Sequence, residues 1–277
     1  MQTPQDSGIT LVLGSGGARG LVHIGVLLAL KELKIPVRAV VGCSMGAQLG
    51  AFYCAGWSPE QMGQDVARMG KRHTLSAFVP KPWGGGLVWN RGVRYFLRKY
   101  LNDRDIESFD IPFAAVACDL QSGAEVVIDK GPAWSAVRAS IAIPGVLAPH
   151  KHQGQPMLAD GALVNPLPVS VARARYPWPV VAVQAQIAPR ERLDQSRRVY
   201  GKLGWMTAAK MANEIMHWEM AQWQLQRHAP DLLIEPDLHE LACFGYHQGH
   251  KAGWLGYIAT RSHGDEITQL LNRRRVR

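Results

Sequence analysis

Apolar and polar positions alternate along the first 60 residues in blocks that are typical of an α/β protein. Apolar runs at 8–13 and 37–41 predict two buried strands. Between them, residues 21–34 combine apolar positions with a charged end, which predicts an amphipathic helix closed by Pro36. Small and apolar residues at 45–54 predict a second, closely packed helix. The order strand, helix, strand, helix indicates a parallel sheet.

The rest of the chain continues this alternation. Ser58 and Pro59 predict the start of a helix that runs to about residue 69, and Gln61 completes a capping box with Ser58. Another helix is predicted to begin with Asn165 as its cap and Pro166 at its first position. Further strands are predicted over 113–120, 124–128, 179–185 and 231–236 and just before Asp160, and further helices over 132–141, 201–227 and 265–271.

Composition and charge narrow the class of protein. The chain has 277 residues, of which 47% are hydrophobic, and it is therefore long enough for one large domain or two small ones. The N-terminus lacks the pattern of a secretory signal and the four cysteines have no metal-site spacing, so we expect a cytosolic protein with reduced thiols. No apolar run is long enough to span a membrane, so we expect any membrane contact to be peripheral.

The net charge of +9 favours an anionic partner, either a phospholipid surface or a nucleic acid. Between Arg68 and Arg104, basic residues are interleaved with tryptophan, tyrosine and phenylalanine. This composition suits a surface against anionic headgroups, a flap over an apolar cleft, or a solvated excursion outside the sheet. No nucleic-acid-binding module accompanies it, so no nucleic acid is expected.

The strongest candidate chemistry lies where the second predicted strand meets its helix. Gly42, Ser44 and Gly46 form a G-x-S-x-G pattern there. A strand that turns abruptly into a helix holds its turn residue in a strained conformation, and flanking glycines remove side chains that would clash. The hydroxyl of Ser44 would then be exposed above the positive end of the helix. The pattern favours a serine nucleophile, and a turn without chemistry is the alternative.

The glycine-rich loop at 14–20, Gly-Ser-Gly-Gly-Ala-Arg-Gly, admits two functional interpretations. A dinucleotide fingerprint needs G-x-G-x-x-G, but the last glycine falls one residue late, and the acidic residue expected about 20 residues further on is missing. The other interpretation is a loop whose amides at Gly16 and Gly17 donate hydrogen bonds to a developing oxyanion. This loop and the serine turn both follow parallel strands, so they can meet over one site.

Other polar residues give weaker signals. We expect His23 to be a packed core histidine rather than a base, and Arg19 to tie down the loop rather than to counter a phosphate. Two histidine pairs have no nearby cysteine or carboxylate set that would complete a metal site, so no metal is expected. They are His150 with His152, and His247 with His250.

Three motifs stand in a particular order: G-S-G-G-A-R-G at 14–20, G-C-S-M-G at 42–46 and D-G-A at 160–162. In this order they resemble the patatin-like phospholipase family, whose members carry a glycine-rich oxyanion loop, a nucleophile elbow and a late D-G-G or D-G-A turn. The family usually has a third glycine where this chain has Ser15. Segments 139–145 and 165–168 also resemble family segments.

The resemblance implies an α/β fold with three layers, α/β/α, and a mostly parallel central sheet. It implies a catalytic core over 8–185, which includes the basic and aromatic excursion at about 70–104. A helical C-terminal extension over 186–277 is expected to pack on the same domain.

The resemblance also implies a serine–aspartate dyad that needs no cofactor. Ser44 would be the nucleophile and Asp160 the base. The remaining implied site residues are Gly16, Gly17, Ala18 and Arg19 in the oxyanion hole, Gly42 and Gly46 at the elbow, and Gly161 and Ala162 in the D-G-A turn.

The implied function is a lipid acyl hydrolase of phospholipase, lysophospholipase or esterase type that acts in lipid catabolism. Its partner would be a lipid ester, and the expected location is cytoplasmic, with contact at the periphery of the inner membrane left open. A catalytically idle adaptor that binds a regulator or a membrane is the alternative, and a nucleotide-binding enzyme is a third candidate. A serine, acid and histidine order is also open, because five histidines follow Asp160: His217, His228, His239, His247 and His263. The sequence does not set the oligomeric state.

Overall fold

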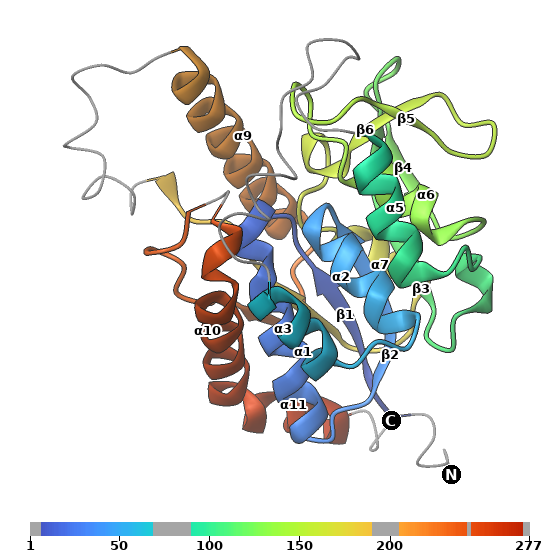
Figure 1. Ribbon diagram of the computed structural model, residues 1–277. Coiled ribbons are helices and arrows are strands. Elements are labelled where there is room, and N and C mark those ends of the chain that lie inside the picture. Colours follow the sequence, from blue (N-terminus) through green and yellow to red (C-terminus); the bar gives the residue numbers. More distant parts are fainter. Residues whose placement is uncertain (1–6, 69–89, 190–204, 243–244, 274–277) are drawn as a thin grey trace.

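The computed structural model describes residues 7–68, 90–189, 205–242 and 245–273. Within these ranges, helices cover both faces of one central sheet, as the ribbon in Figure 1 shows. The predicted stretch at 70–104 lies outside the described residues up to residue 89, so only its last part has a described structure.

The sheet has the strand order β5-β6-β3-β2-β1-β7-β8, and β4 pairs with β3 off this path. In this order, β3, β2, β1, β7 and β8 pair in parallel with their neighbours. On the other side of β3 the pairing is antiparallel: β6 and β4 pair with β3, and β5 pairs with β6. The predicted α/β class with a mostly parallel sheet is therefore confirmed. The strands are β1 Ile9–Leu13, β2 Val37–Cys43, β3 Phe113–Asp119, β4 Glu125–Ile128, β5 His150–Lys151, β6 Met157–Asp160, β7 Val180–Val183 and β8 Leu232–Ile234.

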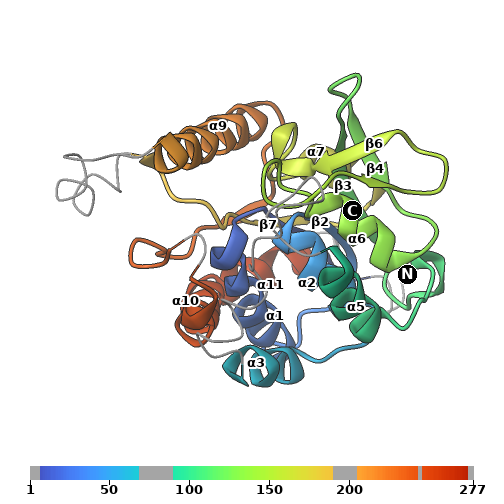
Figure 2. The ribbon, with the colours of Figure 1, turned by 45° about the horizontal axis from the view of Figure 1, so that its top comes forward.

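The helices divide between the two faces, and Figure 2 shows α7 and α9 on one side of the sheet and α1, α2, α6 and α10 on the other. Two buried apolar clusters, one on each face, separate the three layers. The helices are α1 Val22–Glu32, α2 Met45–Cys54, α3 Pro59–Arg68, α5 Asn90–Leu101, α6 Ala133–Ser140, α7 Val169–Arg175, α9 Trp205–Arg227, α10 Gly249–Ser262 and α11 Gly264–Arg273.

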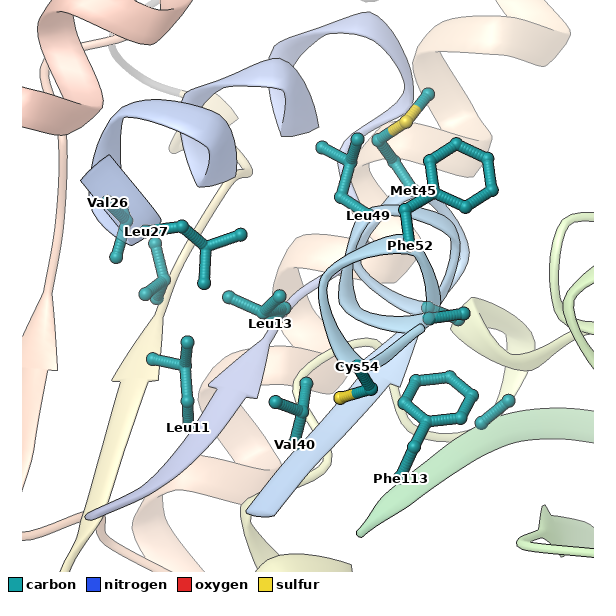
Figure 3. Close-up of a cluster of buried hydrophobic side chains, with 14 of the residues drawn as sticks. Leu11, Leu13, Val26, Leu27, Val40, Met45, Leu49, Phe52, Cys54 and Phe113 are labelled. Carbon is teal, nitrogen blue, oxygen red and sulfur yellow. The ribbon is translucent and has the colours of Figure 1, made fainter. Parts of the chain in front are cut away.

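The larger cluster lies between the sheet and the helices that follow β1 and β2. Figure 3 shows Leu11 and Leu13 of β1 facing Leu27 of α1, and Val40 of β2 close to Phe113 of β3. All five residues of β1 are buried. Because a central parallel strand is covered on both faces, its sequence reads as a continuous apolar run rather than an alternation.

The C-terminal part of the chain contributes a strand to the sheet and a helix to one of the layers that cover it. β8 pairs with β7 in parallel, and α10 packs directly on α1. At this crossing a Cβ on Gly25 would lie 1.7 Å from the carbonyl oxygen of Gly253, so the two backbones touch. The predicted extension over 186–277 is thus not only helical, and the division of the chain at residue 185 stays a prediction.

The capping box at the start of α3 is confirmed, because the amide of Ser58 donates to Gln61 Oε1 at 2.9 Å and the amide of Gln61 donates to Ser58 Oγ at 3.2 Å. The predicted cap at Asn165 is wrong. α7 begins only at Val169, because a residue that precedes a proline is biased away from the helical region, and Leu167 precedes one.

Candidate active site

The turn between β2 and α2 holds Ser44 in the predicted strained conformation, with φ 54° and ψ −120°. The flanking glycines are required by close approach of the backbone. A Cβ on Gly42 would lie 2.5 Å from the amide nitrogen of Ala47, and one on Gly46 would lie 2.0 Å from the carbonyl oxygen of Leu13. The sequence therefore forms a strand-to-helix elbow with a serine at its apex.

Asp160 lies close to Ser44 and comes from β6, on the other side of β3. Cys43, the residue before Ser44, pairs with Val116 of β3, and Asp160 pairs with the next residue, Ala117. Strand β3 thus brings two residues that are 116 positions apart in the sequence to neighbouring positions, and Ser44 Oγ donates a hydrogen bond of 2.6 Å to Asp160 Oδ2.

The second carboxylate oxygen of Asp160 is fixed by the turn that follows β6. Asp160 Oδ1 accepts a hydrogen bond of 2.9 Å from the amide of Ala162 and so caps the short 3₁₀ turn Gly161–Leu163. A Cβ on Gly161 would lie 2.2 Å from the carbonyl oxygen of Val116, which explains the glycine in the D-G-A motif. One oxygen is held by the backbone and the other points at the serine.

Both side chains are almost fully buried, with relative exposures of 5% for Ser44 and 2% for Asp160. Burial disfavours the charged carboxylate and raises the pKa of Asp160 from 3.8 to about 6, although the hydrogen bonds from Ser44 and Ala162 act in the opposite direction. The carboxylate is therefore a stronger base than an exposed aspartate.

Ser140, at the end of α6, holds the backbone of the elbow by hydrogen bonds. Its hydroxyl accepts a hydrogen bond of 2.9 Å from the amide of Ser44 and donates one of 2.6 Å to the carbonyl oxygen of Val116. Ser140 was not among the predicted site residues. A contact across 96 residues leaves no local pattern, and the sequence marks Ser140 only as part of the segment 139–145 that resembles the family.

The glycine-rich loop lies beside the elbow, since Gly46 packs against Leu13 and Gly14 at the start of the loop. Residues Gly17–Leu21 form a 3₁₀ helix that the sequence did not predict. The first N–H groups of such a helix have no carbonyl partner within it, which leaves the amides at Gly17 and Ala18 suited to an external acceptor.

The prediction that Arg19 belongs to the oxyanion hole needs a correction. The amide of Arg19 donates to the carbonyl of Gly16 at 3.2 Å and is therefore already engaged. The side chain of Arg19 is buried and ties the loop to the C-terminal part of the chain, as expected: Nε donates to the carbonyl of Leu241 at 2.9 Å, and Nη2 lies 3.7 Å from Glu214 Oε2.

His23 is a fully buried core histidine, as predicted. Its Nε2 lies 2.8 Å from the carbonyl oxygen of Gly14, so this nitrogen carries the proton and donates. Burial lowers the pKa of His23 to about 4, and the ring is therefore neutral near pH 7. Across the residues that the structure describes, no hydrogen bond joins Ser44 or Asp160 to a histidine.

Among the described residues there is no cluster of three histidine, cysteine or acidic residues that could hold a metal ion. None of their helices combines the length and apolar character needed to cross a membrane.

Fold and site together define an α/β protein with a buried serine–aspartate pair at the carboxyl edge of a parallel sheet, beside a glycine-rich loop. A family model described as patatin-like phospholipase matches residues 11–173, more than half of the chain. The chain belongs to the patatin-like phospholipase family.

Individual relatives agree with this assignment. The chain is 39% identical over 162 residues to an uncharacterized NTE family protein of Mycobacterium tuberculosis, a match that covers 58% of this chain and 44% of the relative. It is 34% identical over 210 residues to lysophospholipase NTE1 of Cryptococcus neoformans, covering 71% of this chain and 12% of the relative. This chain therefore matches less than half of the length of either relative.

Among solved structures, the crystal structure of VipD from Legionella pneumophila is similar, with a TM-score of 0.50 at 15% identity. The match covers 98% of this chain and 67% of VipD. At this level of identity the likeness supports the fold alone.

Proposed function

We propose that the protein is a serine-dependent hydrolase of lipid carboxylic esters, with Ser44 as nucleophile and Asp160 as base. The observation that carries the proposal is the 2.6 Å hydrogen bond from Ser44 Oγ to Asp160 Oδ2. A serine hydroxyl is a weak nucleophile until a base takes its proton during attack. The raised pKa of Asp160, about 6, makes its carboxylate suited to that task while it stays ionised at pH 7.

In the first half of the proposed reaction, Ser44 Oγ attacks the ester carbonyl as its proton moves to Asp160 Oδ2. The same proton then passes to the departing alcohol, which leaves an acyl group on Ser44. In the second half, Asp160 removes a proton from a water molecule that attacks the acyl carbonyl. The fatty acid leaves and Ser44 regains its proton, so the enzyme returns to its starting state.

The negative oxygen of each tetrahedral intermediate would be stabilised by amides of the glycine-rich loop at Gly16, Gly17 and Ala18. The positive end of α2, which begins directly after Ser44, adds to this stabilisation. Backbone donors that are already oriented before the reaction need no reorganisation when the charge develops, which is why they lower the barrier strongly.

One relative is named lysophospholipase NTE1, and a lysophospholipid is therefore the first substrate to test. Hydrolysis of such a substrate by the wild type should fall about 10⁴-fold or more in Ser44→Ala and in Asp160→Asn, since loss of a nucleophile or its base has effects of that order. Near-full activity in either variant would refute the proposed dyad.

The chain offers a matched control for this experiment. Ser122 and Asp119 form a second serine–aspartate hydrogen bond, of 2.5 Å, in the exposed turn between β3 and β4. Ser122→Ala and Asp119→Asn remove the same chemical groups and should leave the rate unchanged. If the wild type hydrolysed no ester faster than Ser44→Ala, the idle adaptor would be the better interpretation.

We also propose a cytoplasmic location and peripheral contact with an anionic membrane. The net charge of +9 supports the membrane contact, as does α5, where Tyr95 is 75% exposed beside Arg94. Arg94→Gln with Lys99→Gln should weaken binding to anionic vesicles more than a pair of equal charge change elsewhere, Lys34→Gln with Arg261→Gln. Equal binding by both pairs would count against contact through α5.

A further inference from the structure

Ser15 is a polar residue in a setting that gives it no access to water. Its relative exposure is 3%, its amide donates to the carbonyl of Pro166 at 2.8 Å, and its hydroxyl accepts a hydrogen bond of 2.7 Å from Gln186 Nε2. A buried hydroxyl costs free energy unless it is hydrogen-bonded. Gln186 supplies that bond across 171 residues of sequence.

Gln186 belongs to the segment that follows β7, and the end of β7 and this segment together contact the first three residues of the glycine-rich loop. The amide of Gly14 donates to the carbonyl of Val183 at 3.1 Å. A Cβ on Gly16 would lie 2.4 Å from the carbonyl oxygen of Ala185, so the backbone of Gly16 rests on this segment. On the loop side, the bond from Gln186 ends on Ser15, which lies between Gly14 and Gly16.

Of these contacts, the bond between Ser15 and Gln186 is the one that joins two side chains and can be removed by substitution. The other amide atom of Gln186, Oε1, is buried and has no hydrogen-bond partner within the described ranges. Within the described structure, the side-chain amide of Gln186 therefore makes its hydrogen bond through the nitrogen, to Ser15.

We propose that Gln186 is a positioning residue for ester hydrolysis, which holds the oxyanion-binding amides at the correct distance from Ser44 through Ser15. The inference rests on the function proposed above. Donors aimed at a developing oxyanion act only within a narrow range of distances, and a displacement of about 1 Å in an active site can cost about 10²-fold in rate. Because the donors act in the transition state, their displacement lowers kcat more than it changes KM.

The test compares Gln186→Met, Ser15→Ala and the double variant with the wild type, by kcat and KM on a soluble short-chain ester and by thermal unfolding. Gln186→Met keeps the length of the side chain and removes the donor. The matched control is Gln184→Met, two residues earlier in the same segment. Gln184 is 2% exposed, and neither of its amide atoms has a partner in the parts of the chain that the structure describes.

We expect each single variant to lower kcat about tenfold or more with KM within about twofold, and the double variant to be no slower than the slower single. Gln184→Met should keep the wild-type kcat. Wild-type kcat in Gln186→Met and Ser15→Ala would overturn the inference, as would additive losses in the double variant or a loss in Gln184→Met of the same size.

The same assay separates this inference from the function on which it rests. If the wild type is no faster than Ser44→Ala, the proposed function fails and the positioning role fails with it. If the wild type is faster but the Gln186 and Ser15 variants match it, the hydrolase stands and the positioning role alone is wrong.

Discussion

Replacing the buried carboxylate of Asp160 should stabilise the fold while it removes activity. Asp160→Asn keeps the shape of the side chain and an oxygen that can accept the bond from the amide of Ala162. It also removes a negative charge from a position that is 2% exposed. The wild type holds this charge only at the expense of folding free energy.

The magnitude follows from the pKa. The pKa of Asp160 is about 6 in the folded protein and 3.8 when unperturbed, and one pKa unit corresponds to about 1.4 kcal/mol, so ionised Asp160 costs about 3 kcal/mol. Because the folded-state pKa is the higher one, the folded protein binds more protons between these two values. The free energy of unfolding therefore decreases as pH rises through this window, and below pH 3.8 the cost disappears.

The assay is thermal or urea unfolding of the wild type and Asp160→Asn at several values of pH. We expect nearly equal stability near pH 3 and an advantage for the variant of about 3 kcal/mol near pH 8, or roughly 6 °C in Tm for a chain of this size. Other titrating groups affect both proteins equally and cancel in the difference. A constant difference in stability across this pH range, or a wild type that is the more stable at pH 8, would refute the conclusion that burial destabilises the ionised carboxylate.

Three further predictions concern the same site. Ser140→Ala leaves the amide of Ser44 without its buried acceptor, so it should destabilise the fold by about 1–3 kcal/mol and lower kcat, whereas unchanged unfolding would contradict the supporting role. Gly46→Ala places a Cβ 2.0 Å from the carbonyl of Leu13 and should lower Tm or abolish soluble expression, and a wild-type Tm would show that the turn can relax. Since kcat/KM reports the free enzyme, it should fall about tenfold from pH 7 to pH 5 with the pKa of Asp160 near 6, and a flat profile would exclude that carboxylate as the base.

The elbow could be predicted from sequence because its requirements are local. Gly42 and Gly46 are imposed by backbone contacts within a few residues of the turn and with the adjacent strand, and Ser44 occupies the middle of the three positions between them. β1 and β2 were likewise visible as continuous apolar runs, because both faces of a central parallel strand are covered.

The elements that the sequence did not reveal depend on contacts between distant segments. α10 contains Gly249, Gly253 and Gly256, which lower its helix propensity, and it forms because its backbone packs against Gly25 and Val22 of α1. No pattern within the sequence of this helix indicates that it packs on α1.

The supports of the site follow the same rule. Arg19 reaches Leu241 across 222 residues, and Gln186 reaches Ser15 across 171, so neither contact leaves a local motif. The motifs indicated which residues meet in the site, and only the tertiary structure shows what holds them there.

Ser44 Oγ is the atom that we propose attacks the ester carbonyl. Labelling of the protein with a fluorophosphonate, followed by mass spectrometry of the peptide that contains Ser44, identifies the nucleophile. We predict one adduct on Ser44 in the wild type, much slower labelling in Asp160→Asn and wild-type labelling in Ser122→Ala. An adduct on another residue, or no adduct under conditions in which the wild type hydrolyses esters, would contradict the account.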